Sequence, residues 1–232
     1  MTFRKIYVLA PFAAATGGIE LAHQLVDVLR NRGVEAYIVY VDNQQISYDQ
    51  TLTSNYKKYN LKTSKIIEDS SDNLLIMPEI YFDFIFEYKY IQFGCWWMSV
   101  DNHYRKTNVI DSLKFFKKVS DRIRIIKGYI GGGLYHYKNT IKDLKRLDGK
   151  IYHFYQSHYA QYHLYSLGFS RVLPLSDYIN AELISCDSGI KKENIILYNP
   201  KKGYSFTKKI IAKMPQYKFI ALQGFNRNEL NE

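Results

Sequence analysis

The stretch from Lys5 to Asp42 constrains the fold of this 232-residue chain more than any other. It reads as an apolar run (KIYVLAPF), a small-residue loop (AAATGG), an amphipathic segment (IELAHQLVDVLRNRG) and a second apolar run (VEAYIVYVD). Both apolar runs favour strands, whereas the segment between them repeats its apolar residues with helical spacing. A strand, a helix and a strand in this order cross over right-handed and pair in parallel. The stretch therefore predicts the first βαβ unit of a parallel sheet.

The rest of the chain continues this alternation of strand and helix patterns. Further strands are expected at residues 65–67, 74–77, 91–100, 151–156, 171–175, 194–200 and 218–224, with helices from Thr107 to Lys150, after the capping residue Ser157, and between the last two strands. Alternation of this kind is typical of an α/β fold with helices on both faces of the sheet. The sequence therefore predicts a Rossmann-like parallel sheet.

Gly17 and Gly18 close the loop that precedes the first predicted helix. Backbone N–H groups there would face the crevice at the carboxyl end of the first strand, where the helix dipole favours an anion such as a diphosphate. A tight turn alone explains two adjacent glycines equally well. No third glycine follows three residues later, so the dinucleotide fingerprint is incomplete and a nicotinamide or flavin enzyme is disfavoured.

The block WWMSVDNHY, residues 96–104, is the most distinctive in the first half of the chain. Asp101, Asn102 and His103 follow an expected strand, which places them at the same sheet edge as the glycine loop. For Asp101 and His103, catalysis or acceptor binding and capping of the next helix are equally compatible with the pattern, since Asp is a favoured N-cap. Trp96 and Trp97 fit core positions on opposite faces of the strand.

Composition excludes several classes of protein. A hydrophobic content of 47% with 16% aromatic residues indicates a globular chain. Two isolated cysteines, Cys95 and Cys186, are too few for a disulfide framework or a zinc site, which makes a reducing cytoplasm the default. Because no signal peptide and no run of eighteen apolar residues is present, we expect a soluble or peripheral cytoplasmic protein.

The formal charge of +10 is concentrated in one segment. Residues 101–150 hold thirteen Lys or Arg against five Asp, a net charge of +8. Basic and apolar residues mixed around Gly131–Gly133 are typical of a surface that rests on the inner face of an anionic membrane and admits a lipid-linked substrate. An ordinary solvated connection between strands is the alternative. No nucleic-acid fold signature is present, so no nucleic-acid partner is expected.

Three blocks resemble bacterial GT-B glycosyltransferases of the family 4 type. TGGIELAHQLVDVLRNRGVEAYIVY is similar to the amino-terminal signature of the family. HFYQSHYAQYHLYSLGFSRVLPLSDYI, and ILYNPKKG followed by FIALQGFNR, are similar to later blocks, especially those of enzymes that build capsule and lipopolysaccharide. The resemblance implies an acceptor-side Rossmann-like domain at residues 1–175. A hinge around Asp177 and part of a nucleotide-sugar-binding domain would follow at residues 176–232.

The resemblance also implies an activity and a set of residues. A sugar would pass from a nucleotide-sugar donor to a cell-surface glycan or a lipid-linked acceptor, without a cofactor beyond the donor and without a bound metal. The donor-binding candidates are Gly17, Gly18, Asn199, Lys201, Lys202 and Gly203, the catalytic candidates are Asp101 and His103, and the acceptor-binding candidates are Glu20, Trp97 and Asn102.

The length of the chain suggests an alternative function. Members of the family are usually longer, and the paired glutamates that grip the nucleotide sugar are expected beyond Glu232, where this sequence stops. A non-catalytic acceptor-binding module, which needs a separately encoded C-terminal half as its partner, is therefore the second expectation.

Overall fold

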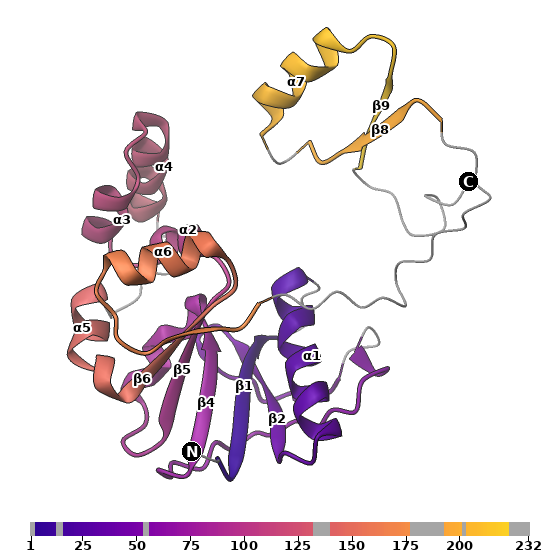
Figure 1. Ribbon diagram of the computed structural model, residues 1–232. Coiled ribbons are helices and arrows are strands. Elements are labelled where there is room, and N and C mark those ends of the chain that lie inside the picture. Colours follow the sequence, from indigo (N-terminus) through magenta and orange to yellow (C-terminus); the bar gives the residue numbers. More distant parts are fainter. Residues whose placement is uncertain are drawn as a thin grey trace. The chain divides into compact units, whose positions relative to one another are not determined.

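The computed structural model describes residues 3–12, 16–52, 56–131, 140–176, 193–200 and 203–222 (Figure 1). The chain separates into two compact units, Met1–Ile179 and Asn180–Glu232. The predicted domain boundary, between residues 175 and 176, lies four residues before this division. The first unit contains a seven-stranded, mostly parallel sheet with helices, so the predicted Rossmann-like α/β fold class is confirmed.

The strand order reverses near the middle of the sheet. We call the carboxyl ends of the central strands at this point the open edge. The strands are β1 (Lys5–Pro11), β2 (Ala36–Asp42), β3 (Gln45–Ile46), β4 (Asn73–Pro78), β5 (Gln92–Trp97), β6 (Ile151–Tyr155) and β7 (Val172–Pro174). They lie in the order β3-β2-β1-β4-β5-β6-β7, and every neighbouring pair is parallel except β2 with β3. The chain runs outward from β1 to β3 and then returns to β4 on the other side. The switch point of the topology therefore lies between β1 and β4, where ligands of open α/β sheets bind.

Helix α1 (Gly17–Asn31) covers one face of the sheet beside β1 (Figure 1). Its apolar residues Ile19, Ala22 and Val26 are buried in a cluster that includes Val8 of β1. The helix ends in a Schellman arrangement, in which the N–H groups of residues 33 and 34 donate to the carbonyls of residues 30 and 29. Gly33 has a φ of 81°, so the predicted left-handed end of this helix is confirmed.

A larger group of helices lies on the opposite face and beyond the carboxyl ends of the strands (Figure 1). It comprises η2 (Glu79–Phe86), α2 (Val100–Lys106), α3 (Val109–Phe115), α4 (Val119–Ile130), α5 (Ile141–Arg146), η3 (Asp148–Lys150) and α6 (His158–Ser166). Trp97 belongs to the core on this face, whereas its neighbour Trp96 belongs to the core beneath α1. Among the described residues, no helix combines the length and the apolar character needed to cross a lipid bilayer.

The structure differs from the sequence-based prediction in three places. Residues 65–67 form no strand, and only an isolated parallel bridge joins Ile38 to Thr63 nearby. The strand expected at residues 91–100 ends at Trp97, because Ser99 caps α2 by accepting a hydrogen bond from the backbone N–H of Asn102 at 3.2 Å. The N-cap role considered for Asp101 is therefore wrong. The long helical segment from Thr107 is divided into α3, α4 and α5.

The described residues of the second unit form a βαβ motif. Strands β8 (Ile195–Tyr198) and β9 (Lys218–Ala221) pair in parallel, and α7 (Tyr204–Lys213) connects them. This arrangement matches the strand, helix and strand expected from the sequence. Gly203 precedes α7 with a φ of 61°, in the left-handed region that favours glycine.

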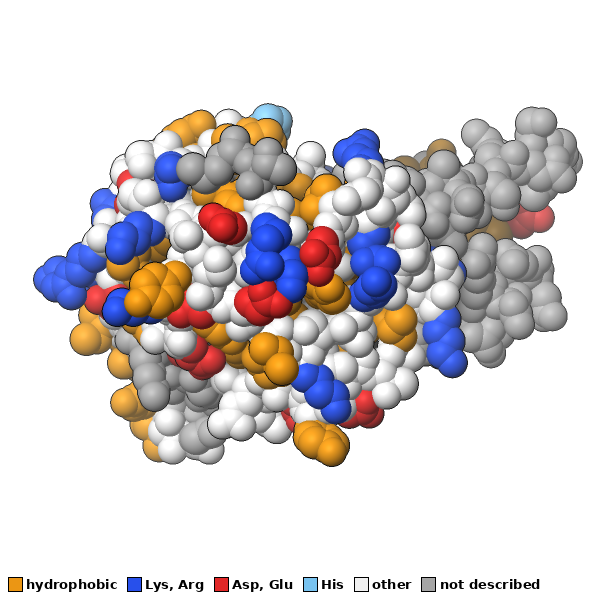
Figure 2. All heavy atoms as spheres, turned by 90° about the horizontal axis from the view of Figure 1, so that it is seen from below, with side chains coloured by type: hydrophobic (Ala, Val, Ile, Leu, Met, Phe, Trp, Pro, Cys, Tyr) orange, Lys and Arg blue, Asp and Glu red, His pale blue; other side chains and the backbone are white. Residues whose placement is uncertain are grey.

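The face at the amino ends of the strands carries charges of both signs side by side (Figure 2). At the start of β1, Arg4 Nη2 lies 2.6 Å from Glu68 Oε2, and the Lys5 ammonium also pairs with Glu68. Lys5 Nζ lies 3.8 Å from Glu35 Oε1 as well. Because these cations are paired with carboxylates, the positive charge of the chain is not concentrated at this end of β1.

Gly94 lies inside β5, where a larger side chain has no room. An added Cβ would lie 2.6 Å from Cε2 of Phe154 on β6 and 3.3 Å from Cγ1 of Ile76 on β4. We therefore expect Gly94→Ala to lower the free energy of unfolding by about 1 to 3 kcal/mol, the usual cost of overpacking a core. Urea unfolding measures this change. Gly149→Ala is the matched control, because a Cβ at Gly149 meets nothing within 4 Å; equal stability of the two variants would contradict the described packing.

Candidate functional site

The amino-terminal end of α1 lies at the switch point of the sheet. The N–H groups of Ile19 and Glu20 both donate to the carbonyl of Thr16, at 3.1 and 3.0 Å. Among the described residues, the N–H groups of Gly17 and Gly18 donate to no acceptor. Backbone N–H groups at the start of a helix are suited to bind an anion.

The two glycines of this helix end differ in their surroundings. A Cβ at Gly17 would meet nothing within 4 Å, whereas a Cβ at Gly18 would lie 3.0 Å from Sδ of Met98. Met98 directly follows β5. Gly18 thus lets α1 approach the segment that follows β5, while Gly17 leaves its backbone open to a ligand. The structure brings the glycine loop and the block at residues 96–104 together, as their common sheet edge predicts.

Glu79 joins this edge and was not among the residues singled out from the sequence. It directly follows β4, its side chain is buried, and its Oε2 accepts a hydrogen bond from the Met98 N–H at 3.2 Å. Burial raises the pKa of Glu79 to about 7, against the opposing effect of hydrogen bonds from the backbone of Met98 and Ser99 and from the Asn102 side chain. A carboxyl group that titrates near neutral pH is typical of functional sites.

A sequence signal for Glu79 existed. It is an acidic residue placed immediately after Pro78, at the carboxyl end of an otherwise apolar strand and inside an aromatic segment. An acid in that position is either exposed at the sheet edge or buried with hydrogen-bond donors around it, and the structure shows the second arrangement. The crowding of aromatic residues in residues 79–90 concealed this signal.

His103 is a core residue, which corrects its assignment as a catalytic candidate. Its side chain is fully buried, with ring centroids 4.9 Å from Trp97 and 5.5 Å from Phe82. Burial lowers the pKa of His103 to about 3, although a hydrogen bond with the backbone of Glu79 opposes the shift. The ring is therefore neutral near pH 7 and closed to a substrate in this conformation.

Trp97 is also a core residue, so its assignment to acceptor binding is corrected in the same way. Its side chain is fully buried, and its Nε1–H donates to Nδ1 of His153 on β6 at 3.1 Å. The physical reason is the alternation of β5, which turns Trp97 toward α2 and η2 rather than toward the open edge. The ring is part of the packed core and is closed to an acceptor in this conformation.

Asp101 and Asn102 remain at the edge of the sheet. Asp101 is partly exposed, and its Oδ1 accepts a hydrogen bond at 3.1 Å from the hydroxyl of Tyr159, in the first turn of α6. Asn102 is exposed, and its side chain contacts the Glu79 carboxyl. A carboxylate and a tyrosine hydroxyl from two neighbouring strand ends therefore meet at this edge, where a carboxylate can accept a proton from a substrate hydroxyl.

Glu20 makes its contacts elsewhere. Its Oε1 lies 3.2 Å from Lys58 Nζ and accepts a hydrogen bond from the Tyr59 hydroxyl. These contacts tie α1 to the segment between β3 and β4. The structure therefore does not show the carboxylate of Glu20 in contact with the residues that follow β4 and β5.

The donor-binding candidates of the second unit are described only in part. Asn199 is exposed directly after β8, and Gly203 is the residue that precedes α7. Lys201, Lys202 and the proposed hinge residue Asp177 lie outside the described residues, as do Gly132 and Gly133 of the glycine run.

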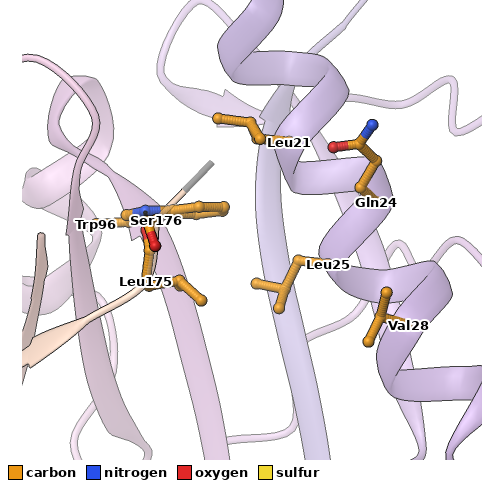
Figure 3. Close-up of a pocket in the computed structure, with 7 residues that line it drawn as sticks. All are labelled: Leu21, Gln24, Leu25, Val28, Trp96, Leu175 and Ser176. Carbon is orange, nitrogen blue, oxygen red and sulfur yellow. Dashed lines mark hydrogen bonds between the residues drawn. The ribbon is translucent and has the colours of Figure 1, made fainter. Parts of the chain in front are cut away.

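A separate hollow lies between α1 and the end of the first unit (Figure 3). It has a volume of about 180 Å³ and is lined by Leu21, Gln24, Leu25, Val28, Trp96, Leu175 and Ser176. The Trp96 Nε1–H donates to the carbonyl of Leu175 at 3.0 Å, which fixes one wall. Because the lining residues carry no charge, this hollow is poorly suited to a diphosphate.

Comparisons with known proteins add no family to this description: no protein-family model matches the chain, and no curated protein is significantly similar to it. Within the part of the chain that the structure describes, no group of three or more His, Cys, Asp or Glu side chains is arranged to hold a metal ion.

Three buried histidines, His23, His103 and His153, and the partly buried His163 favour the neutral form of the imidazole ring. Burial lowers the pKa of His153 to about 4 and also lowers the pKa of His23 and His163, as it does for His103. Each ring has neighbours that suit the neutral form; His23, for example, contacts the Ile19 carbonyl at 2.6 Å and the Tyr40 hydroxyl at 2.8 Å. Protonation would place a charge in the core. Asp148 Oδ1 lies 3.8 Å from Nε2 of His153 and favours the charged form, but the loss of hydration on burial outweighs this attraction.

We expect stability to fall as the pH drops from about 6.5 to about 4. In this range the unfolded chain, whose histidines have a pKa near 6.5, binds protons that the folded chain excludes. The shift of His153 alone corresponds to on the order of 2 kcal/mol at about pH 5. Urea unfolding at several pH values measures this slope, and His153→Gln should flatten it. An unchanged slope in that variant would contradict the description of His153.

Glu79 should change the pH dependence of stability in the direction opposite to that of the histidines. Its pKa is raised from 4.5 to about 7, so its contribution to stability is present below about pH 4.5 and is lost as the pH rises to about 7. We expect Glu79→Gln, which keeps a hydrogen-bonding side chain without the charge, to remove this loss. The same unfolding experiment tests it, and a steeper loss of stability above about pH 5 in the variant would contradict the raised pKa.

Proposed function

We propose that this protein is a glycosyltransferase, or the acceptor-side part of one, that transfers a sugar from a nucleotide-sugar donor to a cell-surface glycan or a lipid-linked acceptor. The observation that carries the proposal is the sheet edge at the switch point, where the open end of α1 at Gly17 and Gly18 lies beside the segment that leads to Asp101 and Asn102. The order of the three sequence blocks supports the same activity.

The glycine end of α1 supplies the recognition of the donor. Two N–H groups at a helix end stabilise the negative charge of a diphosphate, and this charge increases as the bond between sugar and diphosphate breaks. Gly17 leaves room for a phosphate beside the backbone, because a Cβ added at this position would meet nothing within 4 Å. The donor is a substrate in this proposal, and no further cofactor or metal takes part in it.

Asp101 supplies the recognition of the acceptor. A partly exposed carboxylate can accept the proton of an acceptor hydroxyl as that hydroxyl attacks the sugar. Tyr159 holds the carboxylate through its hydroxyl group. Glu79 is a positioning residue, because its buried carboxyl fixes the turn from Met98 to Asn102 from behind.

Protection by nucleotides tests the donor part of the proposal. The thermal stability of the purified chain should increase in millimolar UDP, GDP or CMP sugars, and only one of the three nucleotides is expected to act strongly. A ligand present at a hundred times its dissociation constant stabilises the folded state by about 2.7 kcal/mol. Unchanged stability with all three would refute donor binding by this chain.

Gly17→Ala separates a phosphate site from a simple turn. An alanine at this position meets no neighbour, and it has a higher helix propensity than glycine, so the melting temperature should stay the same or rise slightly. The methyl group should nevertheless obstruct the diphosphate and weaken nucleotide binding by about tenfold or more, which isothermal titration calorimetry measures. Gly149→Ala should leave both properties unchanged. Normal nucleotide affinity in Gly17→Ala would leave the glycine with a role in the turn only.

Asp101→Asn tests the acceptor part. The amide cannot accept the proton of the acceptor hydroxyl, so kcat should fall by about 10² to 10⁴-fold while nucleotide affinity is retained. Tyr159→Phe keeps the carboxylate but removes its hydrogen bond, and should reduce kcat less. Activity is measured as sugar transfer from a radiolabelled donor to membrane lipid or glycan extracts. Full turnover in Asp101→Asn would exclude the aspartate as the base.

A further inference from the structure

The outer side of α4 carries an apolar stripe that is exposed among the described residues. Ile125 is buried and fixes the helix to the core. Four further aliphatic residues follow the spacing i, i+4, i+7 and i+11 and therefore share another side of the helix. They are Val119, Ile123, Ile126 and Ile130, with exposed fractions of 71, 48, 43 and 79%.

Cations border this stripe on both sides. On a helix with 3.6 residues per turn, Arg122 lies on one side of the stripe and Lys127 on the other. Lys114, Lys117 and Lys118 lie exposed in α3 and in the turn before α4. Residues 109–130 contain six Lys or Arg and two Asp, a net charge of +4. One of the acids, Asp121, is 3.8 Å from Arg124.

We propose that this face of α4 docks on an anionic membrane surface. An aliphatic stripe with a cation on each side, and with further lysines in α3 and the turn before α4, fits the boundary between lipid headgroups and acyl chains, since the stripe enters the apolar layer while Arg and Lys contact phosphates. The face at the amino end of β1 is unsuited to this task, because its cations are paired with carboxylates. A stripe of four side chains is also small compared with the roughly 800 Å² that each partner contributes to a standard protein interface.

The position of α4 connects this surface with the candidate site. Helices α3 and α4 lie beyond the carboxyl ends of the strands, next to α2, which carries Asp101 (Figure 1). Docking through α4 therefore holds the open edge of the sheet close to the membrane. This placement deepens the proposed function by favouring a lipid-linked acceptor over a soluble glycan, and that step rests on the proposed function. The docking itself does not.

Vesicle binding tests the docking. The purified full chain is mixed with phosphatidylcholine vesicles, with or without phosphatidylglycerol, and the bound fraction is measured by sedimentation. Anionic vesicles should retain the protein at least about tenfold better than neutral ones. Binding should weaken as salt shortens the Debye length from about 10 Å at 0.1 M to about 3 Å at 1 M. Equal retention on both vesicle types would overturn the proposal.

Two pairs of variants assign the binding to this face. Arg122→Gln with Lys127→Gln should weaken binding to anionic vesicles by about thirtyfold, since each charge contributes about fivefold near such a surface. Lys57→Gln with Lys62→Gln is the matched control, because these lysines are exposed in the segment between β3 and β4. The control should bind like the unmodified protein. Equal weakening in both pairs would indicate a general charge effect and overturn the assignment to α4.

The apolar stripe has its own test. Ile123→Gln with Ile130→Gln should reduce binding about tenfold or more and leave the melting temperature unchanged, because both side chains are exposed. Ile66→Gln with Leu197→Gln removes exposed apolar residues elsewhere and should have no effect. Retained vesicle binding in the Ile123 and Ile130 variant would overturn the proposal.

Two further comparisons complete the test. One asks whether the stripe binds a second copy of the chain, and the other separates the docking from the proposed function. Sedimentation velocity reports whether the chain forms dimers, and dimers that the Ile123 and Ile130 variant abolishes would show that the stripe binds a second copy instead of a membrane. Vesicle binding without any protection by nucleotides would leave the docking intact and refute the donor part of the proposed function. Nucleotide protection without vesicle binding would leave the donor part of the proposed function intact and overturn the docking.

Discussion

Burial of the central strands on both faces is the constraint on which the rest of this structure depends. Adjacent residues of β5 enter different cores, Trp96 beneath α1 and Trp97 beneath η2 and α2, and neither ring is accessible to solvent. Parallel strands of this kind are stable only when helices cover both sides. The chain therefore sends α1 to one face after β1 and η2 to the other face after β4. This divergence of the two connections opens the sheet edge at the switch point.

The same constraint explains which predictions from the sequence were correct. The first βαβ unit was predictable because its signals are local: the apolar spacing of Ile19, Ala22 and Val26 and the glycine at position 33 need no distant partner. His103 and Trp97 were misassigned because the type of a side chain does not reveal the direction in which it points. For Trp97 the direction depends on its position in the alternation of β5. For His103 it depends on Ser99, which begins α2 and places His103 one turn later, against the core.

The titratable residues around the candidate site differ in burial, and burial favours the neutral form of a side chain. Burial lowers the pKa of His103 in α2 and raises that of Glu79 at the start of η2, so burial favours the uncharged form of both groups. The nearest edge residue with a partly exposed carboxylate is Asp101, held by Tyr159. The environment thus distinguishes two neighbouring acids: one fixes the turn from inside and one faces the solvent. Sequence order alone contains no information on this difference.

The distribution of charge fits different residues for donor binding and for acceptor binding in the proposed reaction. At the candidate site, the described partners of the Glu79 and Asp101 carboxyls are neutral groups, including the Met98 N–H, the Asn102 side chain and the Tyr159 hydroxyl. In the proposed site the backbone N–H groups of α1 would hold the diphosphate, while the cations matched to it by resemblance, Lys201 and Lys202, belong to the second unit. Exposed cations of the first unit lie on α3 and α4 among other places, and none of those on α3 and α4 has a described contact with Gly17 or Gly18. An edge with a carboxylate and a hydroxyl is better suited to an acceptor than to a donor, so the first unit by itself favours the acceptor side of the reaction.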